Sequence, residues 1–289
     1  MGNSQSPQVD CQNYLDGYPG LEEPPLEQQR NNLDFYLGLR ESVPDGAKVD
    51  VVLETYYGNY NLLEQHHGYI QWIFPIREHG MNREAFPLTA QEAIKIRESP
   101  EAMARILKAY YMMLDFYGIN LINEETGEVS RSPNYASRFD HLNNSFHNYL
   151  RITRILKSLG EFGLERYKAP LLKFFIKEIF VNKTLPNLEK SCIEFWLPIL
   201  RNENERAHCH QMVRDVTVSS SSSSSRKTSS SNQGLNFEQK DLNSDSNDQI
   251  NDQNVSDDVD QTNPKEDRID PAHDTTQEED INENLVETD

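Results

Sequence analysis

Apolar residues recur at helical spacing through the middle of the chain, and this periodicity predicts a series of helices. The clearest helix begins at Pro100 and ends at Gly118, and its apolar face comprises Met103, Ile106, Leu107, Tyr110, Met113, Leu114 and Tyr117. Other helices are expected at 31–40, 47–57, 134–142, 145–161, 164–182 and 188–213, with a break at Pro170 and a kink at Pro198. A small hairpin is expected in residues 119–131, around a turn at 125–128. The pattern favours an all-α fold, in one multi-helix globular domain.

Residues that favour helix ends support these boundaries. Thr89 is followed three residues later by Glu92, which is the pattern of a capping box. Ser99 stands directly before Pro100, and proline is favoured in the first turn of a helix. One further helix is therefore expected to begin after Thr89, and Ser99 is expected to cap the helix that begins at Pro100.

Charge divides the chain into three parts. Residues 1–29 contain five acidic residues and no Lys or Arg, and residues 219–289 contain 18 acidic residues against five basic ones. The segment 30–218 is left with 23 basic and 24 acidic residues, so −18 of the formal charge of −19 belongs to the ends. Polar, acidic composition of this kind cannot offset the entropy of ordering. We expect disordered segments at 1–29 and 216–289, and a folded domain at 30–215 without the basic field that nucleic-acid binding requires.

The first segment of interest is 67–78, where Tyr69, Ile70, Trp72, Ile73 and Phe74 precede Pro75. A run this apolar is expected either to pack in the core or to form the aromatic wall of a binding site. Arg77 and Glu78 follow directly and would supply charges beside such a wall.

The second segment of interest is 147–161. Arg151, Arg154 and Lys157 are spaced three apart, on the side of the predicted helix opposite its apolar face. This basic ridge is either a solvated face with local ion pairs or a contact for an acidic partner. The acidic C-terminal tail is one candidate for that partner.

Little in the sequence indicates catalysis. The phosphate-binding, dinucleotide-binding, nucleophile-elbow and zinc-protease motifs are absent from the sequence. His208-Cys209-His210 lacks the spacing of known zinc sites, and His66, His67, Asp140, His141 and His147 are expected mainly to bond helix ends and loops. We therefore expect a non-enzymatic protein without a metal or cofactor.

The three cysteines are sparse and lack paired spacing, which indicates a reducing, intracellular compartment. We expect no signal peptide, and no apolar run approaches the ~20 residues that span a bilayer. Gly2 fits an N-myristoylation pattern, and Cys11 would offer a second acylation site. One acyl chain would give only weak membrane anchoring.

Several segments resemble the conserved domain of the opioid growth factor receptor family. They are 32–36, 44–46, 58–60, 67–78, 87–89, 117–119 and 147–161, and the similarity runs from about residue 31 to 214. The resemblance implies an intracellular, non-enzymatic receptor that binds the pentapeptide Met-enkephalin, lies in the cytoplasm, at the nuclear periphery or in the nucleus, and restrains cell growth.

On this interpretation the ligand would contact Tyr69, Trp72, Arg77 and Glu78, with Arg151 and Arg154 as further candidates. The alternative is an intracellular helical scaffold that recruits other proteins and has no peptide ligand. An accessible cleft at the 67–78 segment favours the receptor, and complete burial of that segment favours the scaffold.

Overall fold

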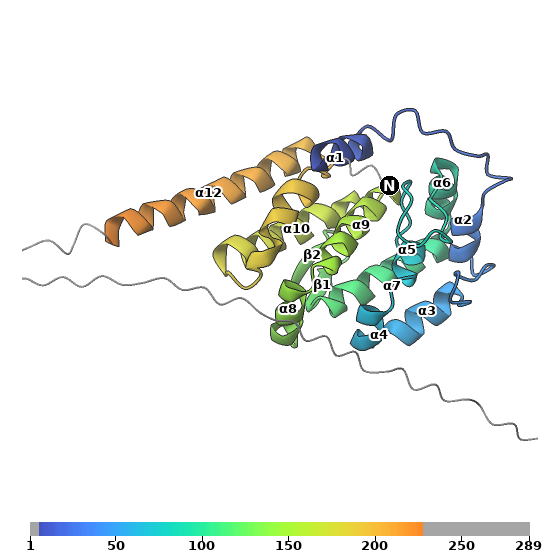
Figure 1. Cartoon of the computed structure of the whole chain (residues 1–289), viewed down its shortest axis with the longest axis horizontal. Helices are drawn as coiled ribbons and strands as arrows, with labels where there is room; N and C mark the ends of the chain where they lie inside the picture. Colours follow the sequence, from blue (N-terminus) through green and yellow to red (C-terminus); the bar gives the residue numbers. More distant parts are fainter. Residues whose placement is uncertain (1–5, 228–289) are drawn as a thin grey trace, which may run out of the picture. The chain divides into compact units, whose positions relative to one another are not determined.

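The computed structural model describes the backbone of residues 6–227 and the side chains of residues 6–218. Short helices dominate the first half of this range: α1 (Pro7–Leu15), α2 (Asn31–Tyr36), α3 (Val49–Tyr56), α4 (Tyr60–Gln65), α5 (Tyr69–Ile73), α6 (Ala90–Glu98) and α7 (Pro100–Phe116). The second half contains β1 (Ile119–Asn123), β2 (Glu128–Arg131), α8 (Tyr135–Asn144), α9 (His147–Glu161), η1 (Glu165–Tyr167), α10 (Lys168–Ile176), η2 (Lys177–Val181), η3 (Pro186–Leu188), α11 (Glu189–Ser191), η4 (Cys192–Trp196) and α12 (Glu203–Lys227). The predicted all-α class is confirmed (Figure 1).

The helix ends follow the local sequence. At the start of α6, the Thr89 hydroxyl accepts from the Glu92 amide, and the Glu92 carboxylate accepts from the Thr89 amide, which completes the predicted capping box. Ser99 caps α7 ahead of Pro100, also as predicted. The hairpin is present as well, and β1 pairs antiparallel with β2.

One core runs through the described domain. Helix α7 packs against α3 and α6, and α10 packs against β2, η4 and α12. The two tryptophans, Trp72 and Trp196, are among its largest fully buried side chains. The core therefore reaches from the 67–78 segment to the last helices of the described chain.

Proline interrupts two of the predicted helices, and one of the two differs from the prediction. The predicted break at Pro170 occurs: a 3-10 turn ends at Tyr167 and α10 begins at Lys168. The single helix predicted for 188–213 is wrong, because η4 ends at Trp196 and α12 begins only at Glu203. Pro198 has no backbone N–H, so it interrupts the segment instead of kinking it.

The prediction that residues 1–29 are disordered is wrong for the part that the structure describes. Residues Pro7–Leu15 form α1, and Cys11 and Tyr14 are buried against the rest of the domain. The polar, acidic composition of this segment did not reveal that these two side chains would be buried. The boundary predicted at 215/216 falls inside α12, which continues to Lys227, and the rest of the predicted acidic tail lies outside the described residues.

Candidate functional site

The aromatic residues of the first signature, which we define as residues 67–78, lie in the core. Trp72 is 1% exposed, its Nε1 donates to the Val43 carbonyl at 3.0 Å, and its ring lies 5.3 Å from that of Phe35. Tyr69 is also fully buried and donates its hydroxyl to the Leu63 carbonyl. Of the two alternatives that the sequence left open for these rings, packing in the core is therefore the one that the structure has, and they form no accessible aromatic wall. The five-residue helix α5 turns both rings inward, and Pro75 follows it.

The second signature, residues 147–161, forms α9, and its predicted exposed basic ridge is also wrong. Arg151 donates to the carbonyls of Leu63 and His66 at 2.7 and 3.0 Å, at the end of α4. Arg154 donates to the Phe74 carbonyl at 3.1 Å, at the end of α5. These cations stabilise the last carbonyls of two short helices.

Lys157 completes this row of cations. Its ammonium lies 2.9 Å from Asp10 and 2.8 Å from Glu78, and its side chain is only 3% exposed. Arg151, Arg154 and Lys157 thus bind the first signature and its neighbouring segments, and α1, to the surface of α9. The two signatures contact each other because each of these three cations of α9 binds a group in another element. The spacing of the cations along the chain cannot reveal those partners.

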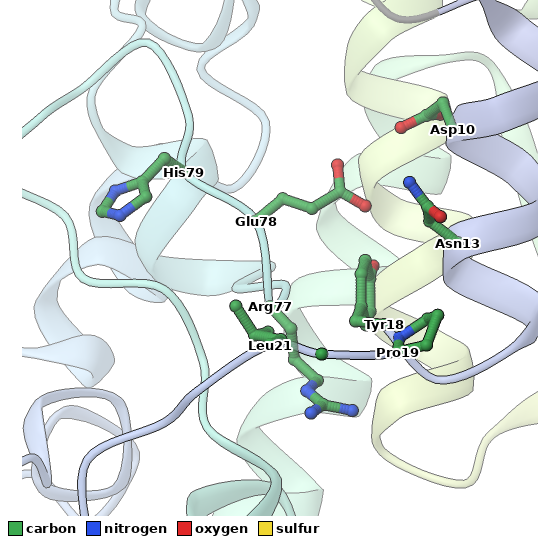
Figure 2. Close-up of a pocket in the computed structure, with 9 residues that line it drawn as sticks. Asp10, Asn13, Tyr18, Pro19, Leu21, Arg77, Glu78 and His79 are labelled. Atoms are coloured by element: carbon green, nitrogen blue, oxygen red, sulfur yellow. The ribbon is translucent and has the colours of Figure 1, made fainter.

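Arg77 and Glu78 line a pocket of about 420 Å³, which we call the N-terminal pocket (Figure 2). Its other wall comes from α1 and the segment after it, with Asp10, Asn13, Tyr18, Pro19, Gly20 and Leu21; His79 completes the lining. Arg77 pairs with Glu23 at 2.6 Å and lies over the Tyr18 ring at 5.2 Å. Burial, together with Glu78, raises the pKa of Tyr18. Two sequence-predicted candidates, Arg77 and Glu78, thus line the same pocket, but the sequence did not indicate that α1 and the segment after it form the other wall.

A second hollow, of about 560 Å³, lies between the two signatures, and we call it the signature hollow. His67, Ile70 and Gln71 line it from the first signature, Gly80 and Met81 from the residues that follow, and His147, Leu150, Arg151 and Arg154 from the second. Met81 and Leu150 are 96% and 71% exposed, so the rim is apolar. A pocket of this volume is of the size that small ligands occupy.

At the polar end of the signature hollow, Gly80 packs closely against the side chains of Gln71 and Arg154. A Cβ on Gly80 would lie 1.6 Å from the Gln71 Oε1 and 2.7 Å from an Arg154 nitrogen, so a larger residue there would displace the ends of these two side chains. Burial lowers the pKa of Arg154 to about 10, which leaves its guanidinium charged at neutral pH. The hollow therefore presents apolar surface beside a fixed positive charge.

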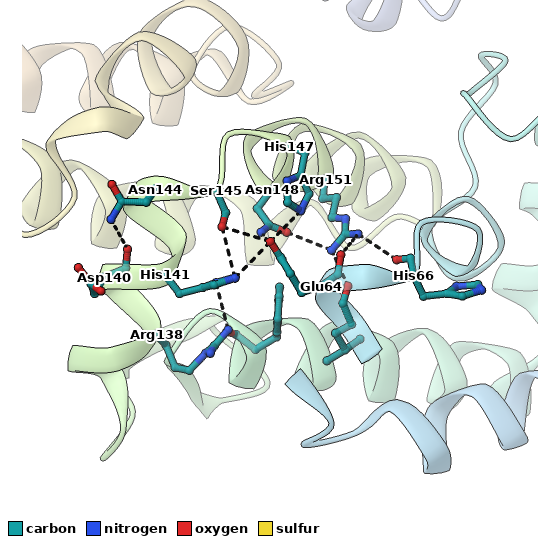
Figure 3. A network of polar contacts seen from close by, with 12 residues as sticks. Glu64, His66, Arg138, Asp140, His141, Asn144, Ser145, His147, Asn148 and Arg151 are labelled. Atoms are coloured by element: carbon teal, nitrogen blue, oxygen red, sulfur yellow. Dashed lines mark hydrogen bonds and ion pairs between the residues drawn. The ribbon is translucent and has the colours of Figure 1, made fainter. Parts of the chain in front are cut away.

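Glu64 gathers several of the predicted histidines beside this hollow (Figure 3). Its carboxylate lies 3.3 Å from His141, 3.2 Å from His147 and 3.0 Å from the Asn148 amide nitrogen. Burial opposes ionisation, but these partners lower the pKa of Glu64 overall. Burial also lowers the pKa of His67 and of His141. Sequence reasoning grouped the histidines and missed Glu64, which occurs in a polar stretch without a recognisable motif.

This cluster lacks the arrangement of a hydrolytic triad. The Ser145 hydroxyl lies 3.3 Å from His141 Nε2, but Nδ1 of that ring faces Arg138 at 3.2 Å instead of a carboxylate. A guanidinium in that position cannot hold the imidazolium that a triad needs. Among the described residues, His, Cys, Asp and Glu form no group of three or more that could hold a metal ion.

Of the two predicted acylation sites, the structure describes only Cys11. Cys11 is 2% exposed, and burial raises the pKa of its thiol to about 11, so the folded chain does not offer it for modification. Gly2 lies outside the described residues. Within residues 6–227, every helix is too short or too polar to cross a membrane.

A helical domain with two ligand-sized hollows beside its most apolar segment is typical of a binding protein. The comparisons with known proteins show the family of the domain. The family profile "Opioid growth factor receptor (OGFr) conserved region" matches residues 26–222, and the chain belongs to this family.

Relatives in the same family are similar over the same part of the chain. The chain is 45% identical over 197 residues to opioid growth factor receptor-like protein 1 of Mus musculus, covering 68% of this chain and 42% of the relative. It is 44% identical over 197 residues to the opioid growth factor receptor of Rattus norvegicus (68% and 34%) and 44% over 193 residues to that of Homo sapiens (67% and 28%). The chain thus spans less than half the length of these relatives, which are named as receptors and not as enzymes. No solved structure matches it significantly.

Proposed function

We propose that this protein is a non-enzymatic peptide receptor, and that it binds an opioid peptide such as Met-enkephalin in the signature hollow. The single observation that carries the proposal is the lining of this hollow. Both family signatures contribute to it, with apolar side chains from Ile70 and Leu150 and a charged guanidinium from Arg154. The names of the relatives support a ligand of the opioid growth factor kind.

The chemistry of the hollow fits a short peptide with apolar side chains and a free carboxylate. Arg154 is held by the Phe74 carbonyl, so it is already oriented when a ligand arrives. A carboxylate would pair with it, while apolar side chains would cover Ile70 and Leu150. Arg77 and Glu78 remain proposed contacts only for a ligand that also reaches the N-terminal pocket.

A role in restraining cell growth, inside the cell and near or in the nucleus, belongs to the same proposal. It rests on the family alone. The geometry bears only on the binding step, and that step is what the following experiment tests.

Calorimetric titration of the full chain with Met-enkephalin tests the proposal. We expect saturable binding to the wild type and a loss of at least tenfold in affinity for Leu150→Glu, because the new carboxylate would pair with the cations of the hollow. Leu39→Glu is the matched control, since Leu39 is 69% exposed and lies outside the hollow, and it should bind as the wild type does. Absence of binding to the wild type, or equal losses in the two variants, would contradict the proposal.

A helical scaffold for other proteins is the second candidate. Phe146 and Leu150 are 66% and 71% exposed and lie one helical turn apart at the start of α9, and Leu150 also lines the signature hollow. Large exposed apolar side chains in a group favour a protein contact. If the wild type does not bind the peptide but Leu150→Glu abolishes the binding of partner proteins, the scaffold function replaces the receptor function.

A further inference from the structure

Tyr14 of α1 occupies a pocket that the rest of the domain builds around its ring. Helix α1 lies at the edge of the domain (Figure 1). It contacts η4 there, and the Tyr14 side chain is nevertheless fully buried. Its hydroxyl donates to the Lys157 carbonyl at 3.1 Å and accepts from the Lys168 ammonium at 3.2 Å. Both hydrogen-bonding functions of the phenol are therefore satisfied by residues outside α1.

Gly160 makes the room for this hydroxyl. It lies inside α9, where glycine costs about 1 kcal/mol of helix stability relative to alanine. A Cβ at this position would lie 1.9 Å from the Tyr14 hydroxyl, far inside contact distance. The glycine thus has a specific use, which is to admit the end of a phenol side chain into the helix surface.

Cations surround the ring itself. The Arg201 guanidinium lies 4.4 Å from the ring centroid and the Lys168 ammonium 5.0 Å from it. Arg201 is held by Glu161 at 2.8 Å, and Lys168 by Glu165 at 3.0 Å and the Ile199 carbonyl at 2.6 Å. These groups keep their positions through partners other than Tyr14, so the pocket is organised independently of its occupant.

The occupant and the pocket belong to different parts of the chain. The pocket residues all lie within the family match at 26–222, whereas Tyr14 precedes it. Fifteen residues, 16–30, connect α1 to α2, and most of them are exposed. Helix α1 buries only Cys11 and Tyr14, and its Asp10 pairs with Lys157, so three side chains chiefly attach it to the domain.

We propose that this pocket, which we call the phenol pocket, is a binding site for a tyrosine side chain of a short helical peptide, and that Tyr14 is its intramolecular occupant. A peptide in solution would compete with α1 for the same site. The tether gives α1 a high effective concentration, so the occupied state dominates until a competitor is present in excess. This site is separate from the signature hollow and does not depend on the function proposed for it.

The first test uses the full chain with Tyr14→Ala and the probe p-cresol, which is the tyrosine side chain alone. Calorimetry should detect saturable p-cresol binding to this variant and none to the wild type. Toluene, which lacks the hydroxyl, should bind at least tenfold more weakly, because Lys168 and the Lys157 carbonyl would lose their partner. Equal binding of the two probes, or equal binding of p-cresol to the wild type, would overturn the proposal. Tyr14→Ala/Gly160→Ala is the control and should not bind p-cresol.

A second test shows whether the pocket accepts a peptide. An acetylated peptide of residues 6–16 should bind the Tyr14→Ala chain at least tenfold more tightly than the same peptide with Tyr14→Phe. If p-cresol binds but neither peptide does, the pocket is only a core cavity and the proposal is wrong.

A third test uses the wild-type chain, so its result does not depend on whether a variant folds. The thiol of Cys11 is buried by α1 and should react with a disulfide reagent only when α1 detaches. Addition of the peptide, with its own cysteine replaced by serine, should speed the labelling of Cys11 at least fivefold and leave the labelling of Cys192 unchanged. An unchanged rate at Cys11 would contradict the displacement of α1.

Discussion

At the scale of single residues, two positions show how burial decides a role. Trp72 carries the most apolar surface of the first signature, and sequence reasoning left open whether it is a core or a ligand residue. Its 1% exposure decides in favour of the core, and its indole nitrogen donates a hydrogen bond to the Val43 carbonyl there. Gly160 had no predicted role at all. Nothing in the sequence indicated that this glycine of α9 would contact a residue of α1.

Replacing Trp72 should cost stability on the scale of a core truncation. We expect Trp72→Ala to lower the free energy of unfolding by about 3–5 kcal/mol, because a large cavity remains next to Phe35. Leu150→Ala is the control, and an exposed substitution of this kind should stay within about 0.5 kcal/mol. Chemical unfolding of both variants, monitored by the far-UV circular dichroism of the helices, measures these free energies without relying on tryptophan fluorescence. Similar values for the two variants would mean that Trp72 is not part of the core.

Gly160→Ala should reverse the usual helix propensity. An alanine inside a helix normally stabilises it by about 1 kcal/mol relative to glycine. Here overpacking against the Tyr14 hydroxyl should destabilise the domain by about 1–3 kcal/mol. In a Tyr14→Ala background the same substitution should be neutral or stabilising, because the clash is gone. Thermal unfolding of the four chains tests this, and a stabilising effect in the wild-type background would contradict the contact.

At the scale of elements, the local signals for helix starts were reliable and the long-range signals were not. The capping box of α6 and the Ser99–Pro100 start of α7 depend on neighbours in sequence, and both are confirmed. The row Arg151, Arg154 and Lys157 was expected to face solvent because it lies opposite the apolar face of α9. The structure covers that face with the first signature and α1, and periodicity within one helix cannot reveal which element packs on its polar side.

Lys157 joins three elements, so its removal should cost more than that of a surface lysine. Lys157→Met leaves Asp10 and Glu78 without their shared cation, and we expect a loss of about 1.5–3 kcal/mol, typical of hydrogen bonds to charged groups. Lys95→Met is the control, because Lys95 pairs with Glu98 at 2.7 Å on the exposed surface and should contribute at most about 1 kcal/mol. Equal effects on the unfolding midpoint would show that the Lys157 contacts do not hold α1 in solution.

At the scale of the whole molecule, the sequence predicted the class and the family but not the hollows. Residues that line the signature hollow come from both signatures, which lie about 70 residues apart in sequence, and only Arg151 and Arg154 of its lining were named as candidates in advance. Glu64 and Tyr14 were missed, since a lone acid and a tyrosine in a polar segment give no signal until the fold places them.

Acidification should weaken the domain through the histidines around Glu64. The folded-state pKa values of His67 and His141 lie below the usual 6.5, with Arg151 and Arg138 adding to the effect of burial. The unfolded chain therefore binds more protons than the folded one, and the stability present above pH 6.5 is lost as the pH falls through that value. Below about 4.5, protonation of Glu64 adds to the loss.

The test compares unfolding midpoints at pH 7.5 and 5.5 for the wild type and for His67→Asn/His141→Gln. The wild type should lose more stability on acidification than the double variant, which removes both titrating groups. An equal or larger loss in the variant would show that these histidines do not titrate as the structure indicates. The comparison cancels the effect of the overall negative charge, which both chains share.

The central claim is that a peptide occupies the hollow between the two signatures, and the methyl groups of methionine report on it directly. Met81 lines the signature hollow and is 96% exposed, whereas Met212 lines a separate pocket beside α12. In a carbon-13 methionine-methyl spectrum of the full chain, unlabelled Met-enkephalin should shift the Met81 signal saturably and leave the Met212 signal unchanged. If the Met81 signal stays in place at saturating peptide, or if Met212 shifts instead, the peptide does not bind in the signature hollow.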